Sequence, residues 1–290
     1  MSVAVTVVNT IIRSINIILI KFIGYHTESA EITAIMLSIF VATFFNTAIL
    51  LLLADADFSS ANYPLLSWIP LKGPYPDLTE NWYLNIAPSL IFTMLLNAVY
   101  LYIEFAISFG TKALFRAMDQ GWSTYCCCKP DKKTKKKTIQ EYVNLYSGPQ
   151  HVMHFKYAAI LTTVFVTLMY GYAIPMLFPI AAFTFLNYYI VDKLLITYYY
   201  QKPPVYDDKL NTAALSLMKY APLFMMFFGY WCMGNVQIFN NVANPLSYAN
   251  IPIITGHTIT PNLSVDLPLF IGGLFVAFVL IFTDVFGRCL

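Results

Sequence analysis

A stripe of polar side chains runs along the otherwise apolar stretch 82–109. Its members lie four residues apart or continue nearly the same helical face: Asn85, Ser89, Thr93, Asn97, Glu104 and Ser108. On a helix of about 3.6 residues per turn, this spacing gives a stripe that drifts slowly around the axis. Small polar groups can replace the hydration shell of a permeating ion, so the stripe predicts an ion pathway. The alternative is packing, because Ser, Thr and Asn also hydrogen-bond across neighbouring helices.

Ionisable side chains inside apolar stretches are the next candidates. They are Arg13, Glu104, Lys156 and Asp192. Such a group is costly at membrane depth, so it faces the protein interior or water. Arg13 has Asn9 one helical turn away, and Glu104 could pair with Lys156 if their helices touch. Asp192 lies near the end of its stretch, where the simpler explanation is a side chain that reaches the headgroups.

A further polar pair, Asn46 and Thr47, lies near the middle of the apolar stretch 32–54. These two residues are the costliest element of that stretch, because an unsatisfied polar group in hydrocarbon is strongly disfavoured. They fit either a pathway or a hydrogen bond to a neighbouring helix.

The sequence lacks the motifs that carry soluble catalysis. It has no G-x-S-x-G, no P-loop, no H-E-x-x-H and no Gly-rich nucleotide fingerprint. His151 and His154 could be read as metal ligands, but they have no nearby carboxylate or Cys to complete a site. We therefore expect no enzyme activity, no metal site and no cofactor.

Composition indicates the elements that must position these groups. Of 290 residues, 58% are hydrophobic and only 11% charged, whereas soluble domains average about 25% charged. The mean hydropathy is +0.63. These values predict an all-α, multi-pass membrane protein. The net charge of +2 gives no reason to expect nucleic-acid binding.

Seven apolar stretches are long enough to cross a hydrocarbon core of about 30 Å. They are residues 3–23, 32–54, 82–109, 153–172, 176–200, 212–233 and 267–286. Each must be a helix, because lipid offers no water to the backbone and barrel strands are shorter and alternate. We expect one transmembrane domain, 1–290, in which the fourth and fifth stretches form a hairpin.

The placement of the positive charges predicts the orientation. Eight of the 17 Lys and Arg residues lie between Lys112 and Lys137, so the linker 110–150 is expected in the cytoplasm. The loops 55–81 and 234–266 are then extracellular, and Asn262 in the second is a glycosylation sequon. The first span would begin outside, so we expect the natural chain to have an upstream part.

The basic linker also carries three adjacent cysteines. The residues expected to contact lipid or to be palmitoylated are Cys126, Cys127, Cys128, Lys132, Lys133, Lys135, Lys136 and Lys137. Adjacent cysteines without a spaced second pair make a zinc site improbable. For the lysines, a solvated flexible linker is the alternative.

Two segments carry a resemblance to a known family. The first contains Val8-Asn9, then Gly24-Tyr25-His26-Thr27-Glu28-Ser29-Ala30-Glu31, then Phe40 and Phe45-Asn46-Thr47. The second contains Gly148-Pro149, then Tyr170-Gly171-Tyr172-Ala173-Ile174-Pro175-Met176-Leu177-Phe178-Pro179, then Tyr189-Ile190-Val191-Asp192-Lys193. In order and spacing these resemble the seven-helix membrane region of the OSCA family of hyperosmolality- and stretch-gated, calcium-permeable cation channels, relatives of the anoctamins.

The resemblance implies a homodimer, with membrane lipids and permeating cations as partners. We expect the plasma membrane as its location, with an endomembrane as the alternative. The resemblance also implies a pore in each subunit, lined by the first four spans. The residues then expected to line it are Asn9, Arg13, Asn46, Thr47, Asn85, Ser89, Thr93, Asn97, Glu104, Thr163 and Thr167. Hinge or gating positions are expected at Pro88, Gly171, Pro175 and Pro179.

Departures from the family keep other functions open. The family has further helices and a cytoplasmic domain before this region, and its pore helix often has a Gly hinge that stretch 82–109 lacks. Span four offers no carboxylate for an anoctamin-like calcium switch. The alternatives are an anoctamin-like phospholipid scramblase and a non-conducting accessory subunit. A seven-helix receptor is disfavoured, because the third span has no terminal acidic-Arg pair.

Overall fold

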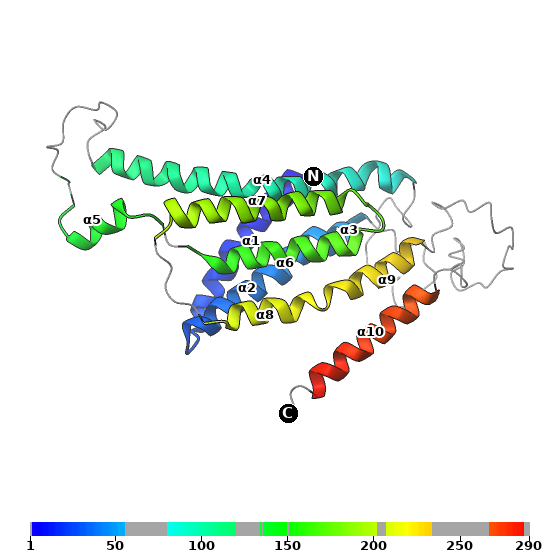
Figure 1. The fold of residues 1–290 in the computed structure, drawn as a ribbon. Helices are drawn as coiled ribbons and strands as arrows, with labels where there is room; N and C mark the ends of the chain where they lie inside the picture. Colours follow the sequence, from blue (N-terminus) through cyan, green and yellow to red (C-terminus); the bar gives the residue numbers. More distant parts are fainter. Residues whose placement is uncertain are drawn as a thin grey trace. The chain divides into compact units, whose positions relative to one another are not determined.

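The computed structural model describes residues 2–55, 80–119, 134, 136–149, 151–201, 207–233 and 267–286. Within these ranges the protein is helical and contains no strand (Figure 1). The elements are α1 (Ser2–Ile23), α2 (Glu28–Phe44), η1 (Phe45–Ile49), α3 (Leu50–Asp55), α4 (Glu80–Asp119), α5 (Ile139–Tyr146), α6 (Met153–Tyr170), α7 (Leu177–Tyr198), α8 (Lys209–Met218), α9 (Ala221–Met233) and α10 (Leu267–Phe286). The all-α prediction is therefore confirmed for the described residues.

Five helical segments within the described ranges are long and apolar enough to cross a membrane. They are Glu28–Leu53, Asn81–Asp119, Met153–Tyr170, Leu177–Tyr198 and Lys209–Cys232. The apolar parts of α1 and α10, Val7–Ile20 and Pro268–Asp284, are shorter. All seven predicted stretches are helical, but the count of seven spans stays a prediction.

Several elements differ in detail from the predicted stretches. The third stretch continues as α4 to Asp119, ten residues past its predicted end, and the linker expected at 110–150 contains the helix α5. The sixth stretch is broken at Lys219 and Tyr220 into α8 and α9. The second contains the π-helical segment η1. In each case the apolar pattern locates the helix but does not determine its continuity.

Local chemistry explains the sharpest helix boundaries. Gly24 follows α1 with a φ of 66°, a left-handed conformation that glycine adopts readily at a helix C-terminus. Thr27 then caps α2 by accepting a hydrogen bond from the Ala30 N–H at 3.4 Å. These two residues turn the chain between the first two helices.

The turn from α6 to α7 also depends on a glycine. A side-chain Cβ on Gly171 would lie 2.5 Å from the Phe178 ring and 2.7 Å from the Thr167 carbonyl oxygen. Pro175 lies in the turn, and Pro179 lies in the first turn of α7, where proline is tolerated. Of the expected hinge positions in this turn, Gly171 is buried and closely packed, whereas Pro175 and Pro179 are exposed.

Contacts divide the chain into two compact units, which are described separately. Unit 1 comprises 1–94, 154–181 and 207–290, and unit 2 comprises 95–153 and 182–206. The helices α4 and α7 each contribute to both units. The single transmembrane domain stays a prediction.

Unit 1 has an aromatic core. Phe165 of α6 packs edge-on against Phe40 and Phe44 of α2, with ring centroids 4.9 and 5.6 Å apart. Phe224 of α9 lies 5.5 Å from both Phe44 and Phe165. Edge-to-face pairs of this kind add about 0.5–1.5 kcal/mol each beyond area burial. They fix α2, α6 and α9 around one another.

Candidate functional site

The strongest polar cluster of unit 1 joins α1 to the middle of the second predicted span. The Asn46 side-chain Nδ2 donates to Asn9 Oδ1 at 2.7 Å, and Asn9 Nδ2 donates to Thr47 Oγ1 at 3.1 Å. Asn46 and Thr47 are buried and Asn9 is half-buried. Three expected pore residues therefore contact one another, and each satisfies part of another's hydrogen-bonding capacity.

The π-helical turn η1 presents this pair to α1. The Leu50 N–H bonds to the Phe45 carbonyl five residues back, as a π turn requires. Such a turn is rare and is concentrated at functional sites, because it distorts the regular helical ladder. The fully buried Tyr170 hydroxyl donates to the Ala48 carbonyl at 2.8 Å. Residues far apart in the sequence thus stabilise the distortion.

Threonines continue the polar contacts along α2 and α6. The Thr43 and Thr162 hydroxyl oxygens are 2.9 Å apart and share a hydrogen bond. Thr163 donates to its own helix, at the Ala159 carbonyl. The Thr167 hydroxyl is buried and has no hydrogen-bond partner within the described part of the chain. Thr167 is therefore the threonine with capacity for a further ligand.

Arg13 lies on the same face of α1 as Asn9, one turn along. Its guanidinium carbon is 5.2 Å from the Phe155 ring centroid, a cation–π geometry. Asn16 continues that face, and its buried Nδ2 has no hydrogen-bond partner among the described residues. The polar face of α1 is thus directed at η1 and α6, and it contains an unsatisfied donor.

The stripe on α4 does not form one environment. Asn85 is exposed and donates to the Asn81 carbonyl, while Thr93 is buried and donates to the Ser89 carbonyl. Both bonds stay within α4, and Pro88 lies inside this continuous helix without ending it. Ser89, Asn97 and Glu104 are half-buried. Asn97 and Glu104 belong to unit 2, so a continuous α4 pathway stays a prediction.

The phenol of Tyr200, just after the end of α7, lies in reach of two carboxylates of unit 2. The His151 ring lies 4.9 Å from the Tyr200 ring. Burial, and after it the negative charges of Glu104 and Asp192, raise the pKa of the Tyr200 phenol to about 12. Glu104 and Lys156 fall in different units, so their ion pair stays a prediction.

An ionic contact that the sequence interpretation missed lies at the break between α8 and α9. The Lys219 ammonium and the Tyr220 hydroxyl donate to the two carboxylate oxygens of Asp284 on α10. Both charges interrupt apolar stretches, and ionisable groups at such positions are strong functional candidates. That rule would have found them in the sequence.

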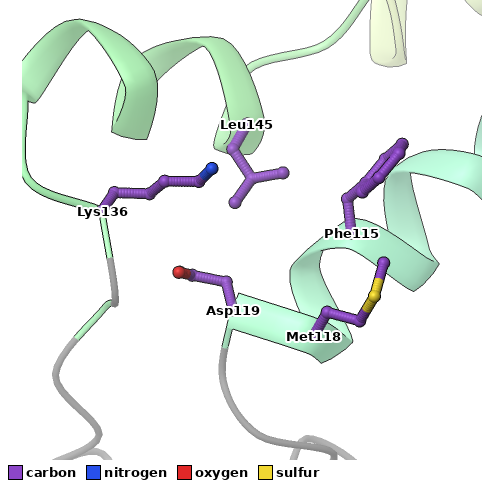
Figure 2. Close-up of a pocket in the computed structure, with 5 residues that line it drawn as sticks. All are labelled: Phe115, Met118, Asp119, Lys136 and Leu145. Carbon is purple, nitrogen blue, oxygen red and sulfur yellow. The ribbon is translucent and has the colours of Figure 1, made fainter.

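Unit 2 also has a cavity at the end of α4. It measures about 450 Å³ and is lined by Phe115, Met118, Asp119, Lys136 and Leu145. Figure 2 shows the side chains of Lys136 and Asp119 on the same side of it, with the Lys136 ammonium next to Leu145. Asp119 is buried and accepts hydrogen bonds from Thr134 and Tyr146 at 2.7 and 3.0 Å. The cavity is therefore apolar with one charged edge.

Some predicted sites lie outside the described residues. They are Cys126, Cys127, Cys128, Lys132, Lys133, Lys135 and Asn262. Lys136 and Lys137 are described and exposed. Within the described ranges, no group of three His, Cys, Asp or Glu residues is arranged to hold a metal ion.

Comparisons with protein-family models, with curated proteins and with solved structures found no match. The function must therefore be argued from the site itself.

Proposed function

We propose that this protein is a membrane channel that conducts cations along a polar seam formed by α1, η1 and α6. The observation that carries the proposal is the hydrogen-bonded set Asn9, Asn46 and Thr47, presented by a π-helical turn inside an apolar span. A π turn forfeits regular hydrogen bonds, so its position beside buried polar groups favours a functional site over a packing contact.

The seam extends beyond that set on both helices. Arg13 and Asn16 continue it on α1, and Thr163 and Thr167 continue it on α6. The unsatisfied Asn16 donor and Thr167 hydroxyl fit groups that exchange partners as an ion passes, because conduction needs sites that bind weakly. In the described state Asn46 and Thr47 bond to Asn9, which fits a closed seam. Opening would replace these bonds with ion or water contacts.

The finer part of the proposal is mechanical or osmotic gating of a calcium-permeable pore. Its support is the resemblance of the two segments at 8–47 and 148–193 to the OSCA family. The same resemblance implies that the first four spans line the pore, which adds the α4 stripe to the seam, and that the protein forms a homodimer. We further propose the plasma membrane as its location.

The experiment is ion flux from liposomes that contain the purified chain. Replacing both Asn9 and Asn46 by Leu removes the two amides together, so that neither amide is left unsatisfied and only the Thr47 hydroxyl loses a hydrogen-bond partner. We expect liposomes with the wild type to release cations and liposomes with the double variant to retain them. Equal flux from a folded double variant would refute the seam as the pathway.

Lipid scrambling is the second candidate. It is favoured by the α4 stripe, since Asn85 is exposed and Ser89, Asn97 and Glu104 are only half-buried. Polar groups on a helix surface could carry a headgroup along that surface. Flipping of labelled phospholipid in the same liposomes, without cation flux, would favour this function over the channel.

A further inference from the structure

The helix α5 presents an apolar face that is exposed. Ile139, Tyr142 and Val143 lie at positions i, i+3 and i+4, and their exposed fractions are 85%, 43% and 51%. This spacing places them on one side of a helix. Gln140, Glu141 and Asn144 are the polar residues of α5, and Leu145 and Tyr146 form its C-terminal end. An eight-residue helix with such a face is not stable alone, so its surroundings must hold it.

The end of α4 holds α5 through backbone carbonyls. Lys112 Nζ donates to the carbonyls of Asn144 and Ser147 at 3.1 and 2.9 Å. Arg116 donates to the carbonyls of Leu145 and Tyr146 at 3.1 and 3.0 Å. Cations at a helix C-terminus satisfy its unpaired carbonyls and stabilise it. The C-terminal end of α5 is therefore fixed to α4.

Lys112 also indicates the depth of this contact. Between residues 82 and 111 the only charged residue is Glu104, so Lys112 is the first cation after a long apolar stretch. Lysine at that position extends its ammonium to the headgroup layer. Because Lys112 bonds to α5 directly, α5 lies at the same level.

The end of α7 gives a second measure of depth. Gln201 Nε2 donates to the Ser147 hydroxyl and the Gly148 carbonyl at 2.6 and 2.7 Å. Gln201 follows Tyr199 and Tyr200, and tyrosines at the end of an apolar helix favour the membrane interface. The segment after α5 is therefore bound by two residues, Lys112 and Gln201, whose positions beside apolar stretches favour the membrane interface.

Positive charge borders the same helix. Lys136 and Lys137 are exposed immediately before Thr138, which caps α5 by accepting from the Glu141 N–H at 3.3 Å. The sequence from 129 to 137 contains six lysines and one acidic residue, Asp131. A basic flank beside an apolar helical face matches the chemistry of an anionic leaflet.

We propose that α5 is an interfacial helix that docks on an anionic bilayer surface. Ile139, Tyr142 and Val143 enter the boundary between headgroups and acyl chains, and Lys136 and Lys137 contact lipid phosphates. The fixed attachment to α4 and α7 preorganises the short helix, which lowers the entropic cost of binding. This inference does not depend on the channel proposal.

The test places an indole on each side of α5 in the full chain. Tyr142→Trp puts it on the apolar face, and Asn144→Trp on the polar face is the matched control. Each variant is reconstituted in nanodiscs containing phosphatidylserine, with or without lipid brominated near the headgroup. The wild-type signal is subtracted to remove the native tryptophans. We expect brominated lipid to reduce the added fluorescence of Tyr142→Trp and to leave that of Asn144→Trp unchanged.

Two outcomes would overturn the proposal. Quenching of the Tyr142→Trp indole by aqueous iodide but not by brominated lipid would place α5 in water. Protection from both quenchers would mean that protein, such as a second copy of the chain, covers this face. A further arm tests the charge: the double variant Lys136→Gln/Lys137→Gln should lose lipid quenching more in phosphatidylserine than in phosphatidylcholine discs, and an equal loss in both would refute the anionic contact.

Discussion

The interior of unit 1 and the basic end of unit 2 satisfy their polar groups in different ways. In unit 1, side chains bond to side chains across helices, as in the pair Asn9 and Asn46. In unit 2, Lys112 and Arg116 bond to backbone carbonyls at the end of α5. Lys112 and Arg116 each bond to more than one carbonyl, whereas Asn9 and Asn46 share a single hydrogen bond. The first region is suited to a changing pathway and the second to a fixed attachment.

The attachment of the segment after α5 to the end of α7 in unit 2 should be more sensitive to added side-chain volume than the contacts of unit 1. A Cβ on Gly148 would lie 2.0 Å from the Tyr199 carbonyl oxygen, and backbone cannot move aside cheaply. We expect Gly148→Ala to lower the free energy of unfolding by about 1–3 kcal/mol, measured by thermal unfolding in detergent. Gly110→Ala is the control, because no atom lies within 4 Å of its Cβ. A Gly148→Ala protein as stable as this control would contradict the close contact between Gly148 and Tyr199.

The side-chain contact of unit 1 should tolerate paired changes better than single ones. Asn46→Leu leaves the Oδ1 of the half-buried Asn9 without its donor, and we expect a loss of about 1 kcal/mol, the range for hydrogen bonds between membrane helices. The double variant Asn9→Leu/Asn46→Leu should recover most of it, because both polar groups are gone. Thermal unfolding of the three proteins gives the comparison. If the double variant lost more stability than the two single variants together, Asn9 and Asn46 would do more than bond to each other.

The ionic contact between Lys219 and Asp284 should also tolerate a paired change better than a single one. Lys219→Met leaves the Asp284 carboxylate without its cation, so we expect a lower unfolding temperature. Adding Asp284→Asn removes that charge and should restore part of the loss. Equal unfolding temperatures for all three proteins would show that the contact does not hold α10 to the break.

The smallest effect concerns pH at the end of α7. Because the pKa of Tyr200 is raised to about 12, the folded protein keeps this phenol protonated where an unfolded chain ionises it near 10. Stability should therefore fall as the pH rises from 10 to 12, and it should be unaffected by Tyr200 below pH 9. Absorbance titration of phenolate, wild type against Tyr200→Phe, isolates the group. A Tyr200 that ionises at pH 10 would contradict the buried, anionic surroundings.

Apolar length was the most predictive feature of the sequence. Every predicted span is helical, and Gly24 and Gly171 mark two of the turns, because both features depend on local chemistry. The helix α5 was missed within a segment that reads as a basic, Cys-containing linker. Its start was nevertheless encoded by Thr138 and Glu141, which have the spacing of a capping box.

Other features depend on tertiary contacts and could not be predicted. The π turn at η1 is stabilised by the Tyr170 hydroxyl, which donates to the Ala48 carbonyl. The two residues are 122 positions apart in the sequence. Of the two alternatives for Asn46, the hydrogen bond to a neighbouring helix is present, since Asn46 bonds to Asn9 of α1, and the ion pathway stays a prediction. Burial also separates members of the α4 stripe, as Thr93 and Asn85 show, although their spacing is regular.

The most direct test of the central claim is patch recording from liposomes under graded suction. Wild type is compared with Asn9→Leu/Asn46→Leu, which alters the seam, and with Glu104→Gln and Asn97→Leu, which alter the α4 stripe. The account predicts a tension-dependent cation current in the wild type that the double variant abolishes. A wild-type current that persists unchanged in the folded double variant, or no current at any tension, would contradict it.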